Sequence, residues 1–447
     1  MDGKKTGFRN KRLVPYLAAG TALLLLAACG GKEKEGDAPG PQQGAASKEP
    51  VELTVWQTVL NVPEEQFMQE YGNKIKEKFP EVTLRFLPYA GKGSTISDLL
   101  AAGQVPDIVY ASIGHVFFGI LDPNLQYDMT ELIQKNKFDL SRFDPAVIER
   151  QRLLAGGGIY GLPTSMDTLV LYYNKDIFDK FGLSYPRNGM TWDETYELAR
   201  KLNRTEDGVS YRGVGMAMGA MFTVNPLSLQ SVDPATGKSR FVSDDGFKKL
   251  FDNFARFYHL PGNGVDKQTA ALAKQREMFD KEKVTAMFVN TAAFATSTYK
   301  DTMNWDVVRL PSFSESPGVG SQPIPTYFYI TNPSKKKEKA FEVISYLTSD
   351  EFQHYASKKG KYTVLSDPKI RNTFGDDIPY FQGKNVKGMF PVKNALPAPL
   401  TKFDSLALAS LNAQFDQVII GPKDVNTALR EAAEDADKKI EAEKKKQ

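Results

Sequence analysis

The stretch from Gly156 to Phe181 constrains the fold of this chain more than any other. It opens with the run GGGIYGLP (156–163), and glycine and proline are the strongest local interruptions of regular structure. A β-branched and aromatic run then follows from Thr168 to Tyr173, preceded by one acid, Asp167, where a strand would begin. We interpret the stretch as the crossing of the backbone from one lobe to another, past a polar group. The glycines and Gly161-Leu-Pro163 are expected to form the hinge, and Thr168–Asp176 the first strand and helix of the second lobe.

Two lobes are also expected from the length, because 447 residues exceed what a single hydrophobic core usually supports. The first 28 residues are not part of either lobe. A basic segment precedes an apolar run from Leu13 to Ala28, which is short for a membrane span and has the flanks of a signal peptide. We therefore predict that residues 1–28 are a signal peptide.

The signal peptide is followed by the only cysteine of the chain, in the context Leu-Ala-Ala-Cys29-Gly. This context resembles a bacterial lipoprotein signal, in which the cysteine is lipidated and becomes the first residue of the mature protein. A lone cysteine has no partner for an intrachain disulfide, so lipidation also accounts for its presence. The resemblance implies an extracytoplasmic protein that is anchored to the cell membrane through lipidated Cys29, with palmitate as one of its acyl groups.

The region from residue 29 to residue 50 is rich in Gly, Pro, Lys and Glu and has no large apolar residue before Val51. Such a segment buries too little apolar surface to fold, so we predict a flexible tether. The first 28 residues also carry five basic residues and one acid, so their removal lowers the formal charge from +3 to about −1. This balance argues against a nucleic-acid partner.

After the tether the chain alternates between strand and helix patterns. Three strands are expected at 51–56, 82–87 and 107–110, with helices at 63–79 and 94–102 between them. Short links in a β-α-β-α-β order predict a parallel sheet covered by helices, and ligands bind such sheets at the carboxyl ends of the strands. These ends are Gln57-Thr58, Pro88-Tyr89 and Ala111-Ser112.

The second half continues as an α/β pattern. Thr191-Trp-Asp-Glu194 matches a capping box that starts a helix to Leu202, and Ser243 is expected to cap a Phe-rich helix. The sequence TEDG (205–208) predicts a hairpin turn, with a calcium loop as a minor alternative. Further strands are expected at 284–289 and 305–310, and a Ser/Gly/Pro-rich loop at 311–326 is expected to form a second crossing. Helices are predicted at 335–355 and on both sides of Gly421-Pro422.

Several kinds of chemistry lack their usual motifs. The three histidines are not placed at metal-ligand spacing, and no metal or cofactor is expected. No Gly-x-Ser-x-Gly motif of a serine hydrolase occurs, and the Gly-Lys-Gly-Ser-Thr run (91–95) fails the phosphate-loop pattern. Carboxylates are plentiful, so a paired-acid glycosidase stays open on composition alone.

Motifs along the whole chain after residue 50 resemble the extracellular solute-binding proteins of family 1, the carbohydrate-binding components of bacterial ABC importers. They are VELTVW (51–56), GQVPDIV (103–109), GIYGLP (158–163), LYYNKD (171–176), MTWDE (190–194), AMFVN (286–290) and the closing IGPKD (420–424). Each motif is weak alone, and their order and spacing make the set specific.

The resemblance implies an α/β fold of the two-lobed periplasmic-binding-protein type (type II), with a ligand cleft and hinge crossings between the lobes. One lobe would comprise residues 51–163 plus 311–365, and the other 164–310 plus 366–447. The implied function is capture of a sugar or oligosaccharide and delivery to ABC permease subunits, by a monomer that is not an enzyme. The alternatives are a lipid-anchored carbohydrate-degrading enzyme and an extracellular ligand sensor for a membrane kinase.

A sugar site needs hydrogen-bonding side chains and aromatic platforms. Asp167 is the first candidate to accept from ligand hydroxyls, or else it caps local backbone at the crossing. Relatives often have Gly-x-Trp after the strand that ends here at Asn290, with the tryptophan stacked on a sugar, whereas this chain has Thr291-Ala-Ala-Phe294. Phe294, Tyr327 or Phe222 would then substitute. The other candidates, each of which is also a plausible packing residue, are Gln57, Asn290, Trp56, Tyr110, Ser112 and Phe328.

Overall fold

The computed structural model describes residues 49–59, 61–298 and 303–446. The expected signal peptide, Cys29 and nearly all of the expected tether lie outside these residues. The described residues belong to one compact unit, Lys48–Gln447, built on two five-stranded sheets. Within the described ranges, no helix is long and apolar enough to cross a bilayer.

The first sheet has the strand order β2-β1-β3-β10-β4. The strands β1, β2 and β3 are parallel, which confirms the expected β-α-β-α-β arrangement, whereas β10 runs antiparallel to β3 and β4. The bounds of these strands are β1 Val51–Gln57, β2 Val82–Leu87, β3 Ile108–Ser112, β4 Gly161–Asp167 and β10 Ile324–Ile330.

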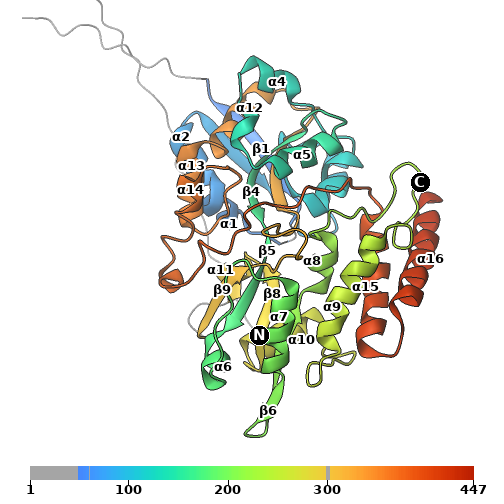
Figure 1. The fold of residues 1–447 in the computed structure, drawn as a ribbon. Helices are drawn as coiled ribbons and strands as arrows, with labels where there is room; N and C mark the ends of the chain where they lie inside the picture. The colour runs from blue at the N-terminus through green and yellow to red at the C-terminus, as the bar shows by residue number, and fades with distance from the viewer. Residues whose placement is uncertain (1–48, 60, 299–302, 447) are drawn as a thin grey trace, which may run out of the picture. The chain divides into compact units, whose positions relative to one another are not determined.

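Helices cover the first sheet and together with it form what we call the first lobe (Figure 1). Two of its turns are π-helical, η1 and η3, a form that often marks functional sites. The helical elements of this lobe are α1 Glu64–Phe67, η1 Met68–Gly72, α2 Asn73–Lys78, α3 Ile96–Ala101, η2 Ile113–His115, η3 Phe117–Leu121, α4 Thr130–Lys135, η4 Leu140–Arg142, α5 Pro145–Leu154, α12 Lys337–Leu347 and α13 Asp350–Lys358.

The second sheet has the order β6-β7-β8-β5-β9. Its strand β5 is buried at every position because it lies between β8 and β9 and is covered by helices. The bounds are β5 Leu169–Asn174, β6 Arg204–Glu206, β7 Val209–Met216, β8 Thr285–Thr291 and β9 Trp305–Arg309. Asp207 and Gly208 both have positive φ in the tight β6–β7 turn, which confirms the expected hairpin.

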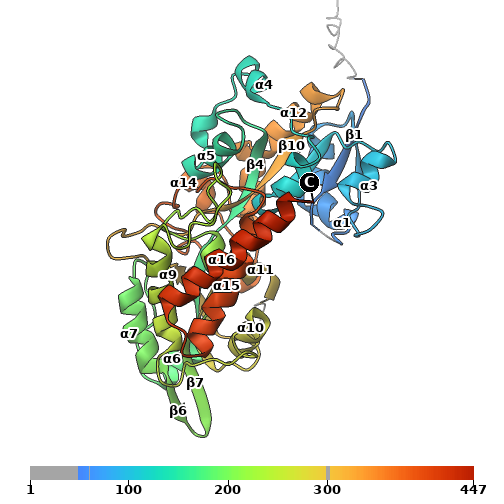
Figure 2. The same cartoon turned by 90° about the vertical axis from the view of Figure 1, so that its right-hand side faces the viewer.

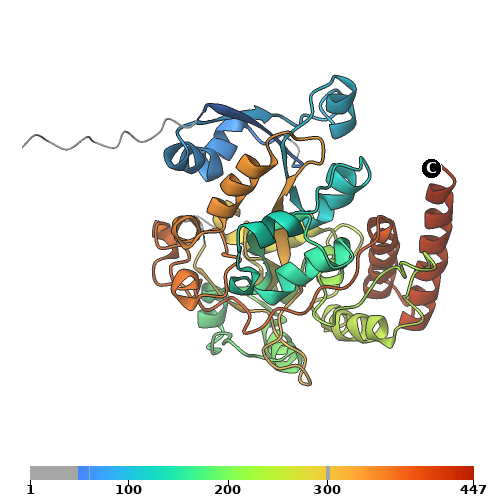
Figure 3. The ribbon, with the colours of Figure 1, turned by 90° about the horizontal axis from the view of Figure 1, so that it is seen from above.

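Helices on the second sheet complete what we call the second lobe. The two C-terminal helices, α15 and α16, run side by side (Figures 2 and 3). The bounds are α6 Lys175–Lys180, α7 Trp192–Leu202, α8 Met218–Thr223, α9 Asp245–Tyr258, α10 Leu272–Asp280, α11 Phe294–Thr298, α15 Asp404–Ile420 and α16 Val425–Lys444; the short α14 Pro368–Arg371 and η5 Pro379–Phe381 precede α15.

The chain passes between the lobes at three places. At the first, β4 leads directly into β5, with only Thr168 between them (Figure 1). At the second, residues 310–323 connect β9 to β10. The third is the segment from residue 366 to residue 403, in which Asn385 bonds to Val307 of the second lobe and Asn394 bonds to Asp144 of the first.

The first passage differs from its expected form. Gly161-Leu-Pro163 was predicted to be hinge, but these residues lie inside β4, which continues in the first sheet to Asp167. The reason for a glycine at 161 is packing, because a Cβ there would lie 2.7 Å from Cε1 of Tyr329. The polypeptide leaves the first sheet only at Thr168, where regular pairing stops.

The residue that caps the N-terminus of the helix is the predicted one at α7 and a different one at α9. At α7 the Thr191 hydroxyl accepts from the backbone N–H of Glu194 at 3.1 Å, and the Glu194 carboxylate accepts from the N–H of Thr191 at 2.8 Å. This confirms the capping box. At α9 the cap is Asp244, which accepts from Gly246 N–H at 3.0 Å, and the expectation that Ser243 caps this helix is wrong.

The Phe-rich stripe of α9 is core, as expected from its helical spacing. Phe247, Phe251, Phe254 and Phe257 are all fully buried, and Phe251 meets Phe222 and Phe415 of neighbouring helices with ring centroids 5.3 and 5.0 Å apart. Burial of each such side chain stabilises the fold by roughly 1.5–3 kcal/mol. The second lobe therefore has a hydrophobic core of its own.

Candidate functional site

A cavity of about 550 Å³ lies where the two lobes meet. The first lobe contributes η2 and η3, which follow the carboxyl end of β3, together with Arg150 of α5. The second lobe contributes α8, which follows β7, and the start of α15. Gln322 and residues 398–402 of the second and third passages complete the lining. We call this cavity the interlobe pocket.

One wall of the interlobe pocket is aromatic. The Phe118 side chain is 39% exposed although it is large and apolar. Its ring centroid lies 5.2 Å from that of His115, 6.4 Å from Tyr89 and 6.5 Å from Trp56. Phe118 therefore presents an exposed ring beside buried Trp56 and half-buried Tyr89 and His115, at the carboxyl edge of β1, β2 and β3.

Phe118 is not among the site residues that are predicted from the sequence. It stands six residues after Ser112, the predicted strand end, in the run His-Val-Phe-Phe-Gly. The sequence feature that could have pointed to Phe118 is the aromatic pair Phe117-Phe118. It follows shortly after a strand whose carboxyl end is expected to face a ligand. The pair lies in η3, where the π-helical turn sets its direction.

The charged residues of the pocket that are buried are Arg150 and Asp404, which are 4% and 8% exposed. The Arg150 guanidinium donates to the side-chain oxygen of Gln322 at 3.1 Å and to the carbonyl of Ala398. Its Nε has no hydrogen-bond partner within the described residues. Burial lowers the pKa of Arg150 to about 10, so the group is still charged at neutral pH.

The Asp404 carboxylate is satisfied within its own turn. It accepts from the backbone N–H of Thr401 at 3.1 Å and from the Thr401 hydroxyl at 3.0 Å. Burial raises the pKa of Asp404 to about 6, because it disfavours the charged form more than these hydrogen bonds favour it. The pocket thus contains one buried cation and one buried carboxyl group.

Asp167, the first site candidate from the sequence, lies at the first passage between the lobes. Its Oδ1 accepts from the backbone N–H of Thr168 at 2.8 Å and from that of Ala293 at 3.2 Å. Asp167 therefore does cap local backbone. Its side chain is half-buried, and burial raises its pKa to about 6 against the opposing effect of the backbone N–H donors. Contact with a ligand stays a prediction.

Tyr110, another predicted site residue, packs against other aromatic side chains of the first lobe. Its hydroxyl is 2.9 Å from that of Tyr71 in η1, and its ring centroid is 4.6 Å from that of Phe328. Burial raises the pKa of Tyr110 well above its usual value, so this hydroxyl keeps its proton. Ser112 ends β3 beside Thr326 and is half-buried.

The two amide candidates occupy strand ends, as expected. Gln57 ends β1 with 3% exposure, and Asn290 lies near the end of β8 with 1% exposure. The side-chain oxygen of Asn290, Oδ1, accepts from the backbone N–H of Thr291 at 2.9 Å. The NH₂ groups of both residues have no partner in the part of the chain that the structure describes.

The other aromatic candidates are packed in this conformation. Trp56 and Tyr327 are fully buried and Phe328 is 1% exposed, and the Tyr327 hydroxyl donates to the carbonyl of Val147 at 2.8 Å. Phe294, at 6% exposure, lies under the guanidinium of Arg276 at 4.9 Å. None of these four rings presents an open face of the kind that Phe118 does.

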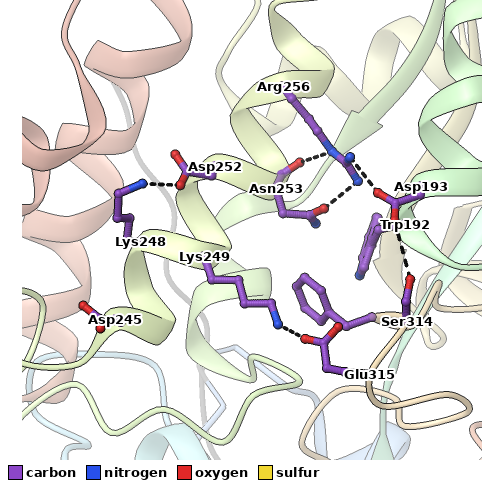
Figure 4. A pocket seen from close by; sticks show the side chains of 11 residues that line it. Trp192, Asp193, Asp245, Lys248, Lys249, Asp252, Asn253, Arg256, Ser314 and Glu315 are labelled. Carbon is purple, nitrogen blue, oxygen red and sulfur yellow. Dashed lines mark hydrogen bonds and ion pairs between the residues drawn. The ribbon is translucent and has the colours of Figure 1, made fainter.

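A second cavity of about 490 Å³ lies on the second lobe, between α7, α9 and residues 313–315 of the second passage (Figure 4). Six of its charged side chains form three ion pairs: Arg256 with Asp193 at 2.7 Å, Lys248 with Asp252 at 2.5 Å, and Lys249 with Glu315. It lies away from the carboxyl ends of the first sheet. The interlobe pocket is therefore the better candidate site.

The described part of the chain holds no group of three or more His, Cys, Asp or Glu side chains that could bind a metal ion. What the interlobe pocket offers is reversible binding, with an exposed aromatic ring, one buried guanidinium, one buried carboxyl group and neutral amides. Such a set recognises a ligand that has both polar groups and an apolar face.

Comparisons with known proteins agree with this fold. The arabinooligosaccharide-binding protein of Bacillus subtilis is 29% identical over 160 residues, which are 34% of this chain and only 35% of that relative. The maltooligosaccharide ABC transporter solute-binding lipoprotein of Streptococcus pneumoniae strain R6 is 23% identical over 92% of this chain and 93% of its own length.

Among solved structures, a sugar transporter from Rhizobium etli in an open conformation matches with a TM-score of 0.69. It is 20% identical, and the match covers 88% of this chain and 99% of that one, which shows a shared two-lobed fold. The family model of the bacterial extracellular solute-binding proteins matches residues 61–354. The chain therefore belongs to the bacterial extracellular solute-binding protein family, and it is a binding protein and not an enzyme.

Proposed function

We propose that this protein captures a sugar or oligosaccharide in the interlobe pocket and delivers it to the permease of an ABC importer. The observation that carries the proposal is the pocket itself. It is bounded by both lobes, lies at the carboxyl ends of the first parallel strands, and combines an exposed aromatic ring with buried polar groups.

The chemistry of a sugar matches this combination. Its ring has an apolar C–H face that can lie on Phe118, and its hydroxyls can donate to Asp404 or accept from Arg150. A buried polar group that a wrong stereoisomer leaves unpaired costs about 1–3 kcal/mol. Residues near the first passage, Asp167 and Tyr110 in particular, would complete the site when the lobes close.

The relatives support the transport role. The two relatives described above are named for binding oligosaccharides, and one of them is named as a lipoprotein of an ABC transporter. Together with the Leu-Ala-Ala-Cys29-Gly context, this supports an extracytoplasmic protein held at the membrane by acyl chains on Cys29. Mass spectrometry of the mature N-terminal peptide tests this, and an unmodified Cys29, or cleavage elsewhere, would remove the anchor from the proposal.

Three passages between the lobes support hinge closure as the binding motion. The proposed rigid bodies are residues 51–167 plus 324–365 and residues 169–309 plus 404–446, with the three passages between them absorbing the change. A ligand that contacts both lobes would favour the closed form, which the permease would then recognise.

A thermal-shift screen of mono- and oligosaccharides tests the function. A ligand present at one hundred times its dissociation constant stabilises the folded state by ~2.7 kcal/mol, which raises the melting temperature measurably. The screen should include amino acids and short peptides as a control class. If those raise the melting temperature and no sugar does, the sugar assignment is wrong.

A further inference from the structure

The buried charges of this chain fall into two kinds. In the first lobe, buried Asp107 lies 3.2 Å from Lys336, and buried Asp144 lies 3.3 Å from Arg371. These pairs follow the general rule that a charge removed from water has an opposite charge beside it. Arg150 and Asp404 are buried to the same degree, yet neither forms an ion pair within 4.0 Å in the described ranges.

The Arg150 guanidinium has only neutral protein partners. It donates to the Gln322 amide oxygen and the Ala398 carbonyl, and its Nε donates to no described group. Asp404 is the nearest candidate counter-ion in the same pocket, but both of its oxygens are engaged by Thr401. Asp404 attracts Arg150 at longer range, but no carboxylate of the described residues forms an ion pair with this guanidinium. Arg150 is thus a buried cation without an ion-pair partner, in a cavity large enough for a sugar.

We propose that the natural ligand carries an acidic group, the carboxylate or phosphate of an acidic sugar, and that Arg150 binds it. This inference rests on the proposed function and narrows its ligand class. A guanidinium presents its N–H groups in a planar fork that matches the oxygens of a carboxylate or phosphate. Water exclusion at a buried site strengthens the attraction.

The other two charged residues of the pocket do not determine whether a negative or a positive ligand is preferred. Asp122 and Lys402, the other two charged lining residues, are both exposed and opposite in sign. Exposed charges are screened by water and salt, so their contributions are small. Buried Asp404 opposes an anion, while Arg150 attracts it. Each terminal nitrogen of Arg150 carries a second N–H beyond the one that it donates to Ala398 or Gln322. The ligand's acidic group would therefore lie on the Arg150 side of the pocket.

The test compares ligands that differ only in charge. Isothermal titration calorimetry is run on the purified protein with oligogalacturonides and with their methyl esters, and in parallel with sugar phosphates and the parent sugars. We expect the acidic member of one pair to bind about 10–100-fold more tightly, since a hydrogen bond to a charged group contributes about 1.5–3 kcal/mol. Which pair shows the preference distinguishes carboxylate from phosphate.

Variants then assign the preference to Arg150. In Arg150→Met the ratio of acidic to neutral affinity should fall to about one, whereas Arg150→Lys should keep part of it because the charge remains. Lys402→Gln removes an exposed cation of the same pocket and should change the ratio by less than threefold. A purely structural role of Arg150 would weaken both members of a pair equally and leave the ratio unchanged.

Two results would overturn the inference, and they differ from failure of the proposed function. Equal binding of the acidic and neutral members, or a preference that survives in Arg150→Met, refutes the role of Arg150 while sugar capture stands. Binding of no sugar, with binding of another solute class, refutes both. If circular dichroism shows that Arg150→Met does not fold, the inference is judged from the ratio of acidic to neutral affinity in the wild type and in Arg150→Lys.

Discussion

The Asp167 carboxylate accepts a hydrogen bond from the backbone N–H of Ala293 at 3.2 Å, across 126 positions of sequence. It joins the point where the chain leaves the first sheet to the turn that follows β8 of the second sheet. The same carboxylate oxygen accepts from Thr168 N–H, in the single residue between the sheets. One acid thus holds the first passage in place.

Replacing Asp167 with alanine should therefore cost stability as well as ligand binding. Two backbone N–H groups would lose their acceptor. The N–H of buried Thr168 would be left unsatisfied, which costs about 1–3 kcal/mol, whereas that of exposed Ala293 can bond to water. Asp167→Asn keeps an oxygen acceptor and should lose less. Urea denaturation measures the stability of both variants, and an alanine variant as stable as the wild type would contradict the capping role.

Stability should depend on pH through Asp167 and Asp404. Burial raises the pKa of each from 3.8 in the unfolded chain to about 6. The folded state therefore binds more protons than the unfolded state between about pH 4 and pH 6, so these two groups make stability fall as pH rises through that range. Their contribution is fully present below the unfolded pKa and is lost above the folded one.

Chemical denaturation at several pH values in that window checks this prediction. Other carboxyl groups, such as Asp98 and Asp128, have lowered pKa values and act in the opposite direction. The difference between wild type and variant is therefore the quantity to compare. Asp404→Asn should make the slope of stability against pH more positive, and an identical slope would mean that Asp404 titrates near its ordinary pKa when folded.

Phe118→Ala should weaken sugar binding with little effect on folding. The ring is 39% exposed in the free protein, so its removal costs the core little, while a ligand would lose an apolar platform. An aromatic contact and its buried area suggest a loss of about 1–2 kcal/mol, or roughly 5–30-fold in affinity.

Calorimetry measures the effect of Phe118→Ala, and Phe118→Trp should restore binding because it keeps an aromatic face. Val242→Ala is a matched control, since Val242 is a 60% exposed apolar residue outside the interlobe pocket. If Phe118→Ala binds the ligand as tightly as Val242→Ala does, the stacking platform lies elsewhere.

Gly161→Ala should destabilise the first lobe by about 1–3 kcal/mol through overpacking. The new Cβ would lie 2.7 Å from Cε1 of Tyr329, a ring that is fully buried and has no room to move. Gly219→Ala in α8 is the control, because its Cβ would meet nothing closer than Asn412 Oδ1 at 3.9 Å.

A glycine-to-alanine change within a helix gains about 1 kcal/mol of helix propensity, so Gly219→Ala should leave stability unchanged or raise it. Thermal denaturation distinguishes the two variants. A Gly161→Ala protein that melts at the wild-type temperature would show that β4 can shift away from Tyr329.

Much of the fold could be predicted from the sequence. The parallel order of β1, β2 and β3, the capping box at Thr191, the hairpin at Asp207-Gly208 and the Phe stripe of α9 depend on local propensity and periodicity. These signals involve residues within a few positions of one another. The chain alone therefore contains the information that specifies them.

The position of the hinge and the exposed aromatic residue of the interlobe pocket could not be predicted from the sequence. The glycines from Gly156 to Gly161 were expected to mark the passage. Gly161 instead lies in β4, where the nearby ring of Tyr329, far along the sequence in β10, leaves no room for a Cβ atom. Trp56, Tyr327 and Phe328 have the composition of a stacking site but are buried by neighbouring strands, whereas Phe118 is exposed. Composition does not tell which face of a strand or turn a second element covers.

The sequence by itself determined the two-lobed α/β class, the order of the elements and the polar character of the first passage, because these follow from spacing along the chain. Only the tertiary structure decided that Asp167 caps Ala293, that Phe118 presents an exposed ring, and that buried Arg150 has no ion-pair partner among the described residues. Each of these depends on segments far apart in sequence meeting in space, and on which charges and rings that meeting leaves uncovered.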